Sequence, residues 1–303
     1  FGSGSIFFSV QLMPPVVTVH GGPATCVVNS LRGASGTEPA IGSTFREVFI
    51  SEGTPPSVEL WPDPGPGRAA IVIGHQEATA LPCPASSGVD AASAAMAPTA
   101  RLAAVAMVFD DVRRTVLLTR RPRHMRTFPG AWVLPGGSVD DTDATTAEAA
   151  ARELLEETGL RAATSPEALC LWESCYPPTV SEWRAAELAG RRRAHFVIVY
   201  HVVRASQAAP LSLQLEECDC ACWVPLADLL PDAKPTADHY ERAPGSPEGE
   251  PVSARLIHGV YPNEEGQGIG RGHLFAFLQL ERALARAKTS RSRSRSRSRG
   301  NAV

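Results

Sequence analysis

Three carboxylates stand close together in a segment that could bind a metal ion. The segment reads Arg152-Glu153-Leu154-Leu155-Glu156-Glu157-Thr158-Gly159-Leu160. Glu156 and Glu157 follow Glu153 by three and four residues, so on a helix the three side chains are neighbours. Like charges at this spacing destabilise an isolated helix, and their concentration here indicates that they bind a strong cation. Ligand sets made only of oxygen favour Mg²⁺ or Mn²⁺ over zinc.

The residues around these carboxylates predict a helix from about Thr146 to Thr158. Thr145 and Glu148 have the spacing of a capping box, in which the threonine caps the helix and the glutamate reaches back to it. Gly159 stands where a helix ends through a left-handed residue. Ahead of the helix, the turn Gly136-Gly137 lets the backbone approach a metal ion or a phosphate closely.

Short apolar runs on both sides of the helix predict the strands of a sheet. Mixed strands with one helix near the middle favour a mixed sheet covered by helices on its faces. The expected fold class is therefore α/β. The runs are Leu102–Phe109, Thr115–Thr119, Trp132–Leu134, Ala168–Trp172, His195–Val203 and Asp219–Val224.

The glycine turn and the carboxylate segment together resemble the Nudix box, G-x5-E-x7-R-E-U-x-E-E-x-G-U, in which U is aliphatic. The match is complete from Arg152 to Leu160, while Asp143 stands where the box has its first Glu and eight residues, not seven, then precede Arg152. This resemblance implies an α/β/α sandwich. It also implies a Mg²⁺- or Mn²⁺-dependent hydrolase that cleaves the diphosphate of a nucleoside diphosphate linked to another moiety.

The same resemblance implies roles for individual residues. Glu153, Glu156, Glu157 and the carbonyl of Gly137 are the expected metal ligands, and Arg152 is expected to pair with Glu156 and hold its rotamer. A further carboxylate from outside the box is expected as ligand or general base. Glu217, just before a predicted strand, is the first candidate and Glu216 the second. Whether Glu153 or Glu217 activates water is left open.

Two branches of the family are similar to this chain. Leu117–Arg121, Pro135-Gly136-Gly137, Trp172-Glu173-Ser174 and Tyr176-Pro177-Pro178 resemble the branch called nucleoside diphosphate-linked moiety X motif 17, for which capped RNA is an associated substrate. The pattern L-L-T-x-R, with Arg126, Gly130 and the paired Asp140 and Asp143, resembles coenzyme A diphosphatases and accounts for the extra residue. A catalytically silent nucleotide- or RNA-binding module is a third interpretation.

Basic and aromatic residues near the box are candidates for binding the substrate. Arg120, Arg121 and Arg126 lie between the second strand and the glycine turn, and guanidinium groups suit phosphate oxygens. A solvated basic loop is the alternative. His124 is expected at the surface. Three aromatic residues could stack on a base, although core or rim positions are the commoner outcome: Trp172, Tyr176 and Trp183.

Cysteine usage favours a reducing compartment. Seven cysteines, an odd number, do not indicate a disulfide framework in a chain of 303 residues. Cys218, Cys220 and Cys222 alternate with other residues, so we expect them on one face of a strand that ends at Trp223, as packing residues. They lack the C-x2-C spacing typical of zinc.

Composition divides the chain into three parts. Residues 1–95 are rich in Pro, Gly, Ser and Ala and are expected to form a poorly structured extension, with possible strands at 58–61 and 69–73. Residues 96–285 should form the hydrolase domain, with a core of about 100–232. Residues 286–303 hold seven Lys or Arg and no acid, while the remainder holds 22 Lys and Arg against 32 Asp and Glu.

The basic segment ends in an alternating Arg/Ser run, from Arg291 to Arg299, that resembles the tails of RNA-processing proteins. It has no apolar face to bury, so we expect disorder. RNA phosphates or an acidic partner are its expected ligands, with an inert solvated tail as the alternative. These features favour the cytoplasm or the nucleus, and no apolar stretch is long enough to span a bilayer.

Overall fold

The computed structural model describes residues 16–19, 26–30, 35–38, 41, 43–53, 57–76 and 100–300. Its strands are β1 (Val16–Val19), β2 (Ser35–Glu38), β3 (Ser43–Gly53), β4 (Ser57–Trp61), β5 (Ala69–His75), β6 (Arg101–Asp110), β7 (Thr115–Arg120), β8 (Trp132–Val133), β9 (Gly136–Ser138), β10 (Glu167–Tyr176), β11 (Ala194–Arg204), β12 (Cys220–Pro225), β13 (His239–Tyr240) and β14 (Val252–Ser253). The helices are α1 (Val27–Ser30), α3 (Thr146–Thr158), α4 (Val180–Leu188), α5 (Ala254–Ile257), α6 (Arg271–Gly300) and the 3-10 helix η2 (Leu226–Leu229).

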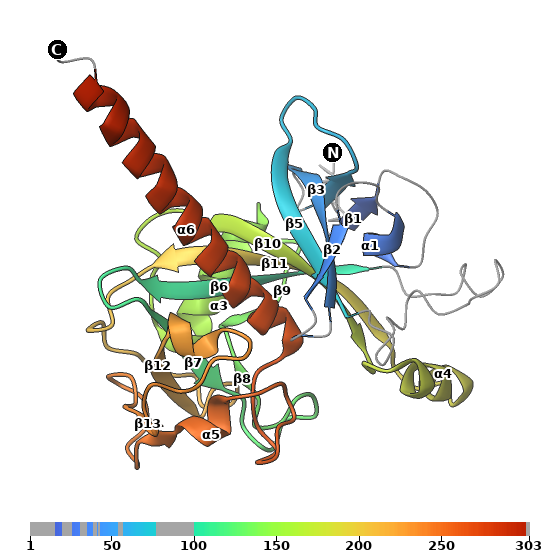
Figure 1. The fold of residues 1–303 in the computed structure, drawn as a ribbon. Helices are drawn as coiled ribbons and strands as arrows, with labels where there is room; N and C mark the ends of the chain where they lie inside the picture. The colour runs from blue at the N-terminus through green and yellow to red at the C-terminus, as the bar shows by residue number, and fades with distance from the viewer. Residues whose placement is uncertain are drawn as a thin grey trace, which may run out of the picture.

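A mixed sheet of twelve strands carries the described part of the chain (Figure 1), along the path β1-β4-β3-β5-β10-β11-β6-β7-β12. β2 pairs with β3, β8 with β7 and β9 with β6, while β13 and β14 form a small separate sheet. β11 runs parallel to β6 and antiparallel to β10, and β10 runs parallel to β5. All six predicted strands are confirmed, and β10 extends four residues beyond the expected Trp172.

Two apolar cores cover the two faces of this sheet. Ala104 and Ala106 of β6 share one core with Leu154 of α3. Met107 of the same strand shares the other core with Phe277 of α6. Because alternate residues of a strand point to opposite faces, α3 and α6 lie on opposite sides of the sheet. The predicted α/β/α sandwich is therefore confirmed.

Helix α3 has the predicted bounds and caps. The hydroxyl of Thr145 accepts a hydrogen bond from the N–H of Glu148 at 3.1 Å. Gly159 is left-handed, with φ of 72°, and its N–H donates to the carbonyl of Leu155. One detail differs from the expected capping box, because the Glu148 carboxylate accepts from the N–H of Ala144, not from that of Thr145.

The N-terminal region is more ordered than its composition predicts. The possible strands at 58–61 and 69–73 are confirmed as β4 and β5, and β3 pairs antiparallel with both. Val48, Leu60 and Ile73 are fully buried in the core that also contains α3. Polar residues interrupt the sequence of β3, so it lacks the apolar run by which a core strand is recognised. In place of a separate extension, these strands continue the sheet.

The basic tail, for which the sequence predicts disorder, is drawn as the end of helix α6, which continues through Gly300 and projects from the body of the molecule (Figure 1). The first turns of α6 pack on the sheet through Phe275 and Phe277, and no proline interrupts the residues that follow. A helix that is already nucleated adds one hydrogen bond with each further residue. Within the described residues, no helix combines the length and apolarity needed to cross a membrane.

A buried histidine ties the start of α3 to two strands. The hydroxyl of Thr146 lies 2.9 Å from Nε2 of His201 on β11 and donates to the carboxylate of Glu52 on β3 at 2.9 Å. His201 is 1% exposed, and burial lowers its pKa to about 4 although a hydrogen bond with the backbone of Pro166 opposes this shift. The neutral imidazole is therefore the form that supports α3.

We expect this histidine to make stability depend on pH. In the unfolded chain His201 takes up a proton below its usual pKa of 6.5, whereas in the folded chain it does so only below about pH 4. The unfolded state therefore binds more protons between these values, and stability falls as pH falls. Between about pH 7.5 and pH 5 the free energy of unfolding should fall by about 2 kcal/mol more in the wild type than in His201→Gln. Urea unfolding at both pH values measures the difference, and parallel losses in the two proteins would contradict the assignment.

Candidate active site

Three carboxylates from two segments converge at the carboxyl end of α3. Glu153 and Glu157 belong to the helix, and Glu217 belongs to the loop before β12. Each offers an oxygen, and the three oxygens lie within 4.8 Å of one another. The structure thus brings together two of the predicted box ligands and the first candidate from outside the box.

The loop that carries Glu217 is fixed by the last turn of α3. The N–H of Ser212 donates to the carbonyl of Thr158 at 2.8 Å, and the N–H of Gln214 donates to the carbonyl of Glu157 at 2.9 Å. These carbonyls have no partners within their own helix, so they are available to the loop. The N–H of Glu217 then donates to the carbonyl of Gln214. The end of the helix therefore determines where the third carboxylate stands.

The glycine turn packs directly on the carboxylates. The N–H of Gly136 donates to the Glu157 carboxylate at 3.2 Å. A Cβ atom added at Gly137 would lie 2.5 Å from Oε1 of Glu153, and one added at Gly136 would lie 2.5 Å from the carbonyl oxygen of Ala104. Only glycine lets β9 pair with β6 and touch α3 at once. The sequence predicts that this turn lets the backbone approach a metal ion or a phosphate; the structure shows its close contact with the carboxylate of Glu153.

Burial and mutual repulsion disfavour the charged forms of two of these acids. Glu157 is 6% exposed, and burial raises its pKa to about 7 although hydrogen bonds from Gly136 and Cys218 oppose the shift. Burial also raises the pKa of Glu153, against its bond with Arg152. A bound cation would stabilise the charged forms of these neighbouring acids by neutralising them. The donor set, which contains only oxygen, suits Mg²⁺ or Mn²⁺.

Arg152 holds the box together, as the sequence predicts in part. Its guanidinium bonds Glu153 at 2.9 Å and Glu156 at 3.0 Å. It also bonds both oxygens of Asp143, at 3.0 and 2.9 Å, and this bidentate contact is the first cause of the raised pKa of Arg152. Asp143, which stands where the box has its first Glu, therefore holds Arg152 in place. Glu156, with its side chain 57% exposed, stays on the Arg152 side, outside the group of three carboxylates.

The predicted phosphate-binding arginines have different environments. Arg121 lines a cavity of about 430 Å³ together with Glu157, Glu217 and Gly137. Arg120 is held by Asp219 at 2.7 Å. Arg126 is exposed and does not line this cavity. Sequence reasoning missed two arginines that do line it, Arg101 and Arg192.

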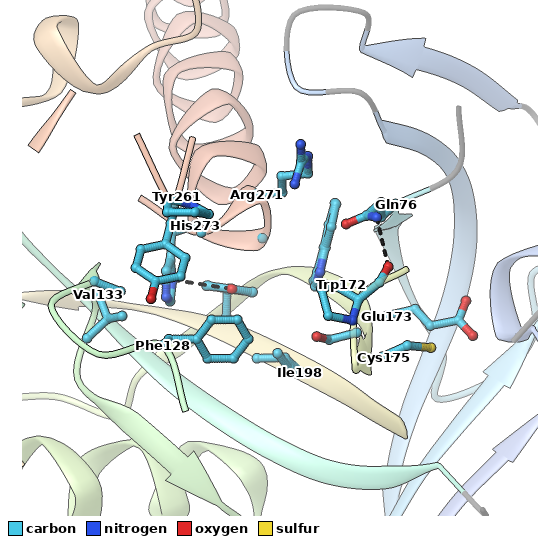
Figure 2. A pocket seen from close by; sticks show the side chains of 17 residues that line it. Gln76, Phe128, Val133, Trp172, Glu173, Cys175, Ile198, Tyr261, Arg271 and His273 are labelled. Carbon is cyan, nitrogen blue, oxygen red and sulfur yellow. Dashed lines mark hydrogen bonds between the residues drawn. The ribbon is translucent and has the colours of Figure 1, made fainter. Parts of the chain in front are cut away.

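Aromatic side chains bound a second, smaller cavity, of about 240 Å³, that shares Phe128 and His273 with the first. Figure 2 shows Tyr261 above Phe128, whose rings are 5.7 Å apart, with Trp172 and Arg271 farther along the hollow. Of the predicted aromatics, Trp172 lines this cavity and Tyr176 lines the larger one.

The remaining candidates have structural surroundings. Trp183 is buried in the core on the α3 side of the sheet. His124 is exposed as predicted, and its Nε2 lies 3.9 Å from Glu216. Cys220 and Cys222 are buried packing residues of β12. Cys218, in contrast, precedes the strand and donates from Sγ to Glu157 at 3.3 Å, which its place in an alternating run did not indicate.

We expect a methyl group at Gly137 to disturb the carboxylates and not the fold. In Gly137→Ala the side chain of Glu153 must move away, because its oxygen and the new Cβ atom cannot both occupy the turn. Mn²⁺ affinity should fall by about 10–100-fold, which is the usual effect of disturbing groups that orient metal ligands.

Titration with Mn²⁺, followed by electron paramagnetic resonance, measures this change. The control is Gly270→Ala, where the nearest atom to an added Cβ would be 3.5 Å away. Equal Mn²⁺ affinity in both variants would show that the turn does not shape the metal site.

Comparison with known proteins identifies the domain that contains this site. Residues 99–243 match the family model described as NUDIX domain. The chain is 37% identical over 136 residues to the m7GpppN-mRNA hydrolase NUDT17 of Danio rerio, covering 42% of each protein. It is 38% identical over 113 residues to the protein of that name from Homo sapiens, covering 36% of this chain and 32% of the relative.

A second relative is matched over a shorter segment. The uncharacterized Nudix hydrolase NudL of Enterobacter sp. (strain 638) is 51% identical over 45 residues, covering 15% of this chain and 23% of that protein. The chain thus spans less than half the length of these curated relatives. Among solved structures, the NUDIX domain of Shewanella oneidensis NrtR complexed with ADP ribose aligns at 26% identity with a TM-score of 0.33, covering 47% of this chain and 81% of that one. Since the match includes both the glycine turn and the carboxylate helix, residues 99–243 of this chain form a NUDIX domain.

Proposed function

We propose that this chain is a divalent-cation-dependent hydrolase that cleaves a diphosphate linkage in a nucleoside diphosphate derivative. The observation that carries the proposal is the convergence of Glu153, Glu157 and Glu217 on the glycine turn, beside a cavity that Arg121 also lines. Acidic oxygens suit the cation, and guanidinium groups suit the phosphates. The site needs both the cation and the guanidinium groups, because the glutamates and the substrate's phosphates are all negatively charged and would otherwise repel one another.

In this proposal Glu153, Glu156, Glu157 and the carbonyl of Gly137 hold Mg²⁺ or Mn²⁺. When bound, the cation would neutralise phosphoryl oxygens and lower the pKa of a water molecule. Arg152 orients Glu153 and Glu156 through its contacts at 2.9 and 3.0 Å. The arginines of the larger cavity, Arg101, Arg121 and Arg192, orient the diphosphate.

We assign the role of general base to Glu217. Glu153 is engaged by the guanidinium of Arg152, and an ion-paired carboxylate is a poorer proton acceptor. Glu217 is exposed, lines the cavity and makes no ion pair among the described residues. Its loop is fixed to the end of α3, so its carboxylate keeps its position beside the other two.

The proposed substrate is capped RNA. Two lines support it: the relatives called m7GpppN-mRNA hydrolase, and the aromatic residues Phe128, Tyr176 and Phe196 in the larger cavity. A methylated guanine is cationic, and aromatic rings attract such groups. Coenzyme A is the alternative, favoured by Asp140 and Asp143, which match the box of its diphosphatases.

We expect the Glu217→Gln protein to lose turnover by about 10²–10⁴-fold through kcat, since proton acceptance contributes this much in enzymes. Mn²⁺ affinity should change far less. The matched control is Glu216→Gln, because that neighbouring side chain is exposed and faces His124. Initial rates over a range of substrate concentrations measure the effect, and a similar kcat in the two variants would remove Glu217 from the mechanism.

The substrate is tested with capped RNA, coenzyme A, nucleotide sugars and dinucleoside polyphosphates, each with Mg²⁺ or Mn²⁺, by following product masses. Cleavage within one diphosphate that is lost in Glu153→Gln and in Glu156→Gln, and kept in the exposed control Glu167→Gln, would support the hydrolase and identify its substrate class. Tight binding of one compound without turnover of any would favour the silent binding module.

We further propose that the basic end of α6 binds RNA phosphates. Residues 286–300 carry seven Lys or Arg on a helix that leaves the body of the protein. Deleting residues 289–300 should weaken binding of capped RNA and flatten its dependence on salt, because fewer counterions are released. Affinity for a cap dinucleotide should stay the same. Unchanged RNA binding at low salt would contradict the proposal.

A further inference from the structure

A second group of potential metal ligands lies away from the carboxylates of α3. It consists of Cys26, His75 at the end of β5 and Glu173 on β10. All three are buried, with at most 2% of each residue exposed. His75 and Glu173 are partners in the parallel register of β5 and β10, so the sheet itself holds their side chains next to each other. Neither residue takes part in the proposed hydrolysis.

The distances within this group fit the ligands of one tetrahedral ion. Sγ of Cys26 lies 3.4 Å from Nδ1 of His75 and 3.2 Å from Oε2 of Glu173. The remaining edge, from Nδ1 to Oε2, is 3.7 Å. Zinc bonds of about 2.3 Å to sulfur and about 2.0–2.2 Å to nitrogen and oxygen place tetrahedral ligand atoms roughly 3.3–3.6 Å apart. The observed edges of 3.2, 3.4 and 3.7 Å bracket this range, so small side-chain shifts would make the three atoms one face of a zinc-sized tetrahedron.

Charge gives a second reason for a cation. The side chain of Glu173 is fully buried, and its ion-pair partners among the described residues are the histidines His75 and His195, not Lys or Arg. A buried carboxylate is costly unless it is neutralised. Zn²⁺ with one thiolate, one carboxylate and a neutral imidazole has no net charge, which suits this interior. Sulfur among the ligands selects zinc over Mg²⁺.

The other oxygen of Glu173 is held by neighbouring groups. His195 places Nε2 2.7 Å from Oε1, and the N–H of Val27 donates to the same atom at 2.8 Å. The N–H of Val28 donates to Oε2 at 3.0 Å. Partners of this kind fix the orientation of a metal-binding carboxylate. The site therefore has ligands and a supporting set of hydrogen bonds.

We propose that Cys26, His75 and Glu173 bind one zinc ion, with a water molecule at the fourth position and His195 as the residue that orients Glu173. The ion would join the segment of Cys26 and strand β5 to strand β10 of the Nudix domain. Its role is structural, because the ligands are buried and none of them lines the larger cavity beside the α3 carboxylates; Glu173 borders the smaller, aromatic cavity.

The test uses the full chain, depleted of metal and then titrated with Co²⁺ alone. We expect a thiolate-to-cobalt charge-transfer band and the visible absorption of tetrahedral cobalt, both reaching full intensity when one Co²⁺ per chain occupies this site, whether or not the α3 carboxylates bind a further ion. Adding Zn²⁺ should remove both signals. Cobalt bound only by the α3 carboxylates would give neither, so Glu153→Gln should leave the spectrum unchanged.

Variants then assign the ligands. Cys26→Ser should lose the charge-transfer band and retain less than a tenth of the zinc, whereas the buried control Cys222→Ser should keep both. His195→Gln should keep the band with Zn²⁺ affinity lowered about 10–100-fold, as expected for an orienting group. If Cys26→Ser does not fold, the wild-type spectrum still decides. A wild-type protein without the thiolate band, or a Cys26→Ser protein that retains it, would overturn the proposal.

Discussion

The close contact between α3 and the glycine turn is the constraint on which the site depends. A Cβ atom at Gly136 would collide with the backbone of β6, and a Cβ atom at Gly137 would collide with the carboxylate of Glu153. The turn can therefore pair with β6 and lie against the helix only as glycine. This contact brings the N–H of Gly136 to Glu157 and fixes how far α3 stands from the sheet.

Placing acids at this contact has an electrostatic cost, and the surrounding residues offset it. Arg152 lies between Asp143 and two glutamates of the helix, and Asp143 holds the guanidinium through both oxygens. Glu157 has no such counter-ion among the residues that the structure describes, and it accepts hydrogen bonds from Gly136 and Cys218. Burial, with Glu153 and Glu217 nearby, raises the pKa of Glu157 to about 7. Glu157 is thus the acid of the helix most in need of a cation, while Arg152 stabilises Glu153 and Glu156.

Local signals were sufficient to predict α3, because its caps and its acids lie within fifteen consecutive residues. The capping threonine, the terminal Gly159 and the bounds of the helix are all confirmed. Glu217 could be named in advance only because it precedes a recognisable strand; its closeness to Glu153 depends on the fold. Arg101 and Arg192 enter the cavity from distant parts of the chain, and nothing local to either distinguished it from a surface arginine.

In the N-terminal region too, the sequence does not show which distant segments the fold brings together. The segments that became β4 and β5 could be recognised as possible strands, but polar residues interrupt β3, and nothing in the sequence indicated that β5 pairs with β10. Cys26 lies 49 residues from His75 and 147 from Glu173, and no spacing motif can encode a group that only the completed sheet assembles. Glu173 and Trp172 are consecutive on β10, yet alternate side chains of a strand point to opposite faces. The strand that supports the aromatic cavity with Trp172 therefore supports the buried cysteine and histidine with Glu173, so a change in the N-terminal strands should be felt in the shape of that cavity.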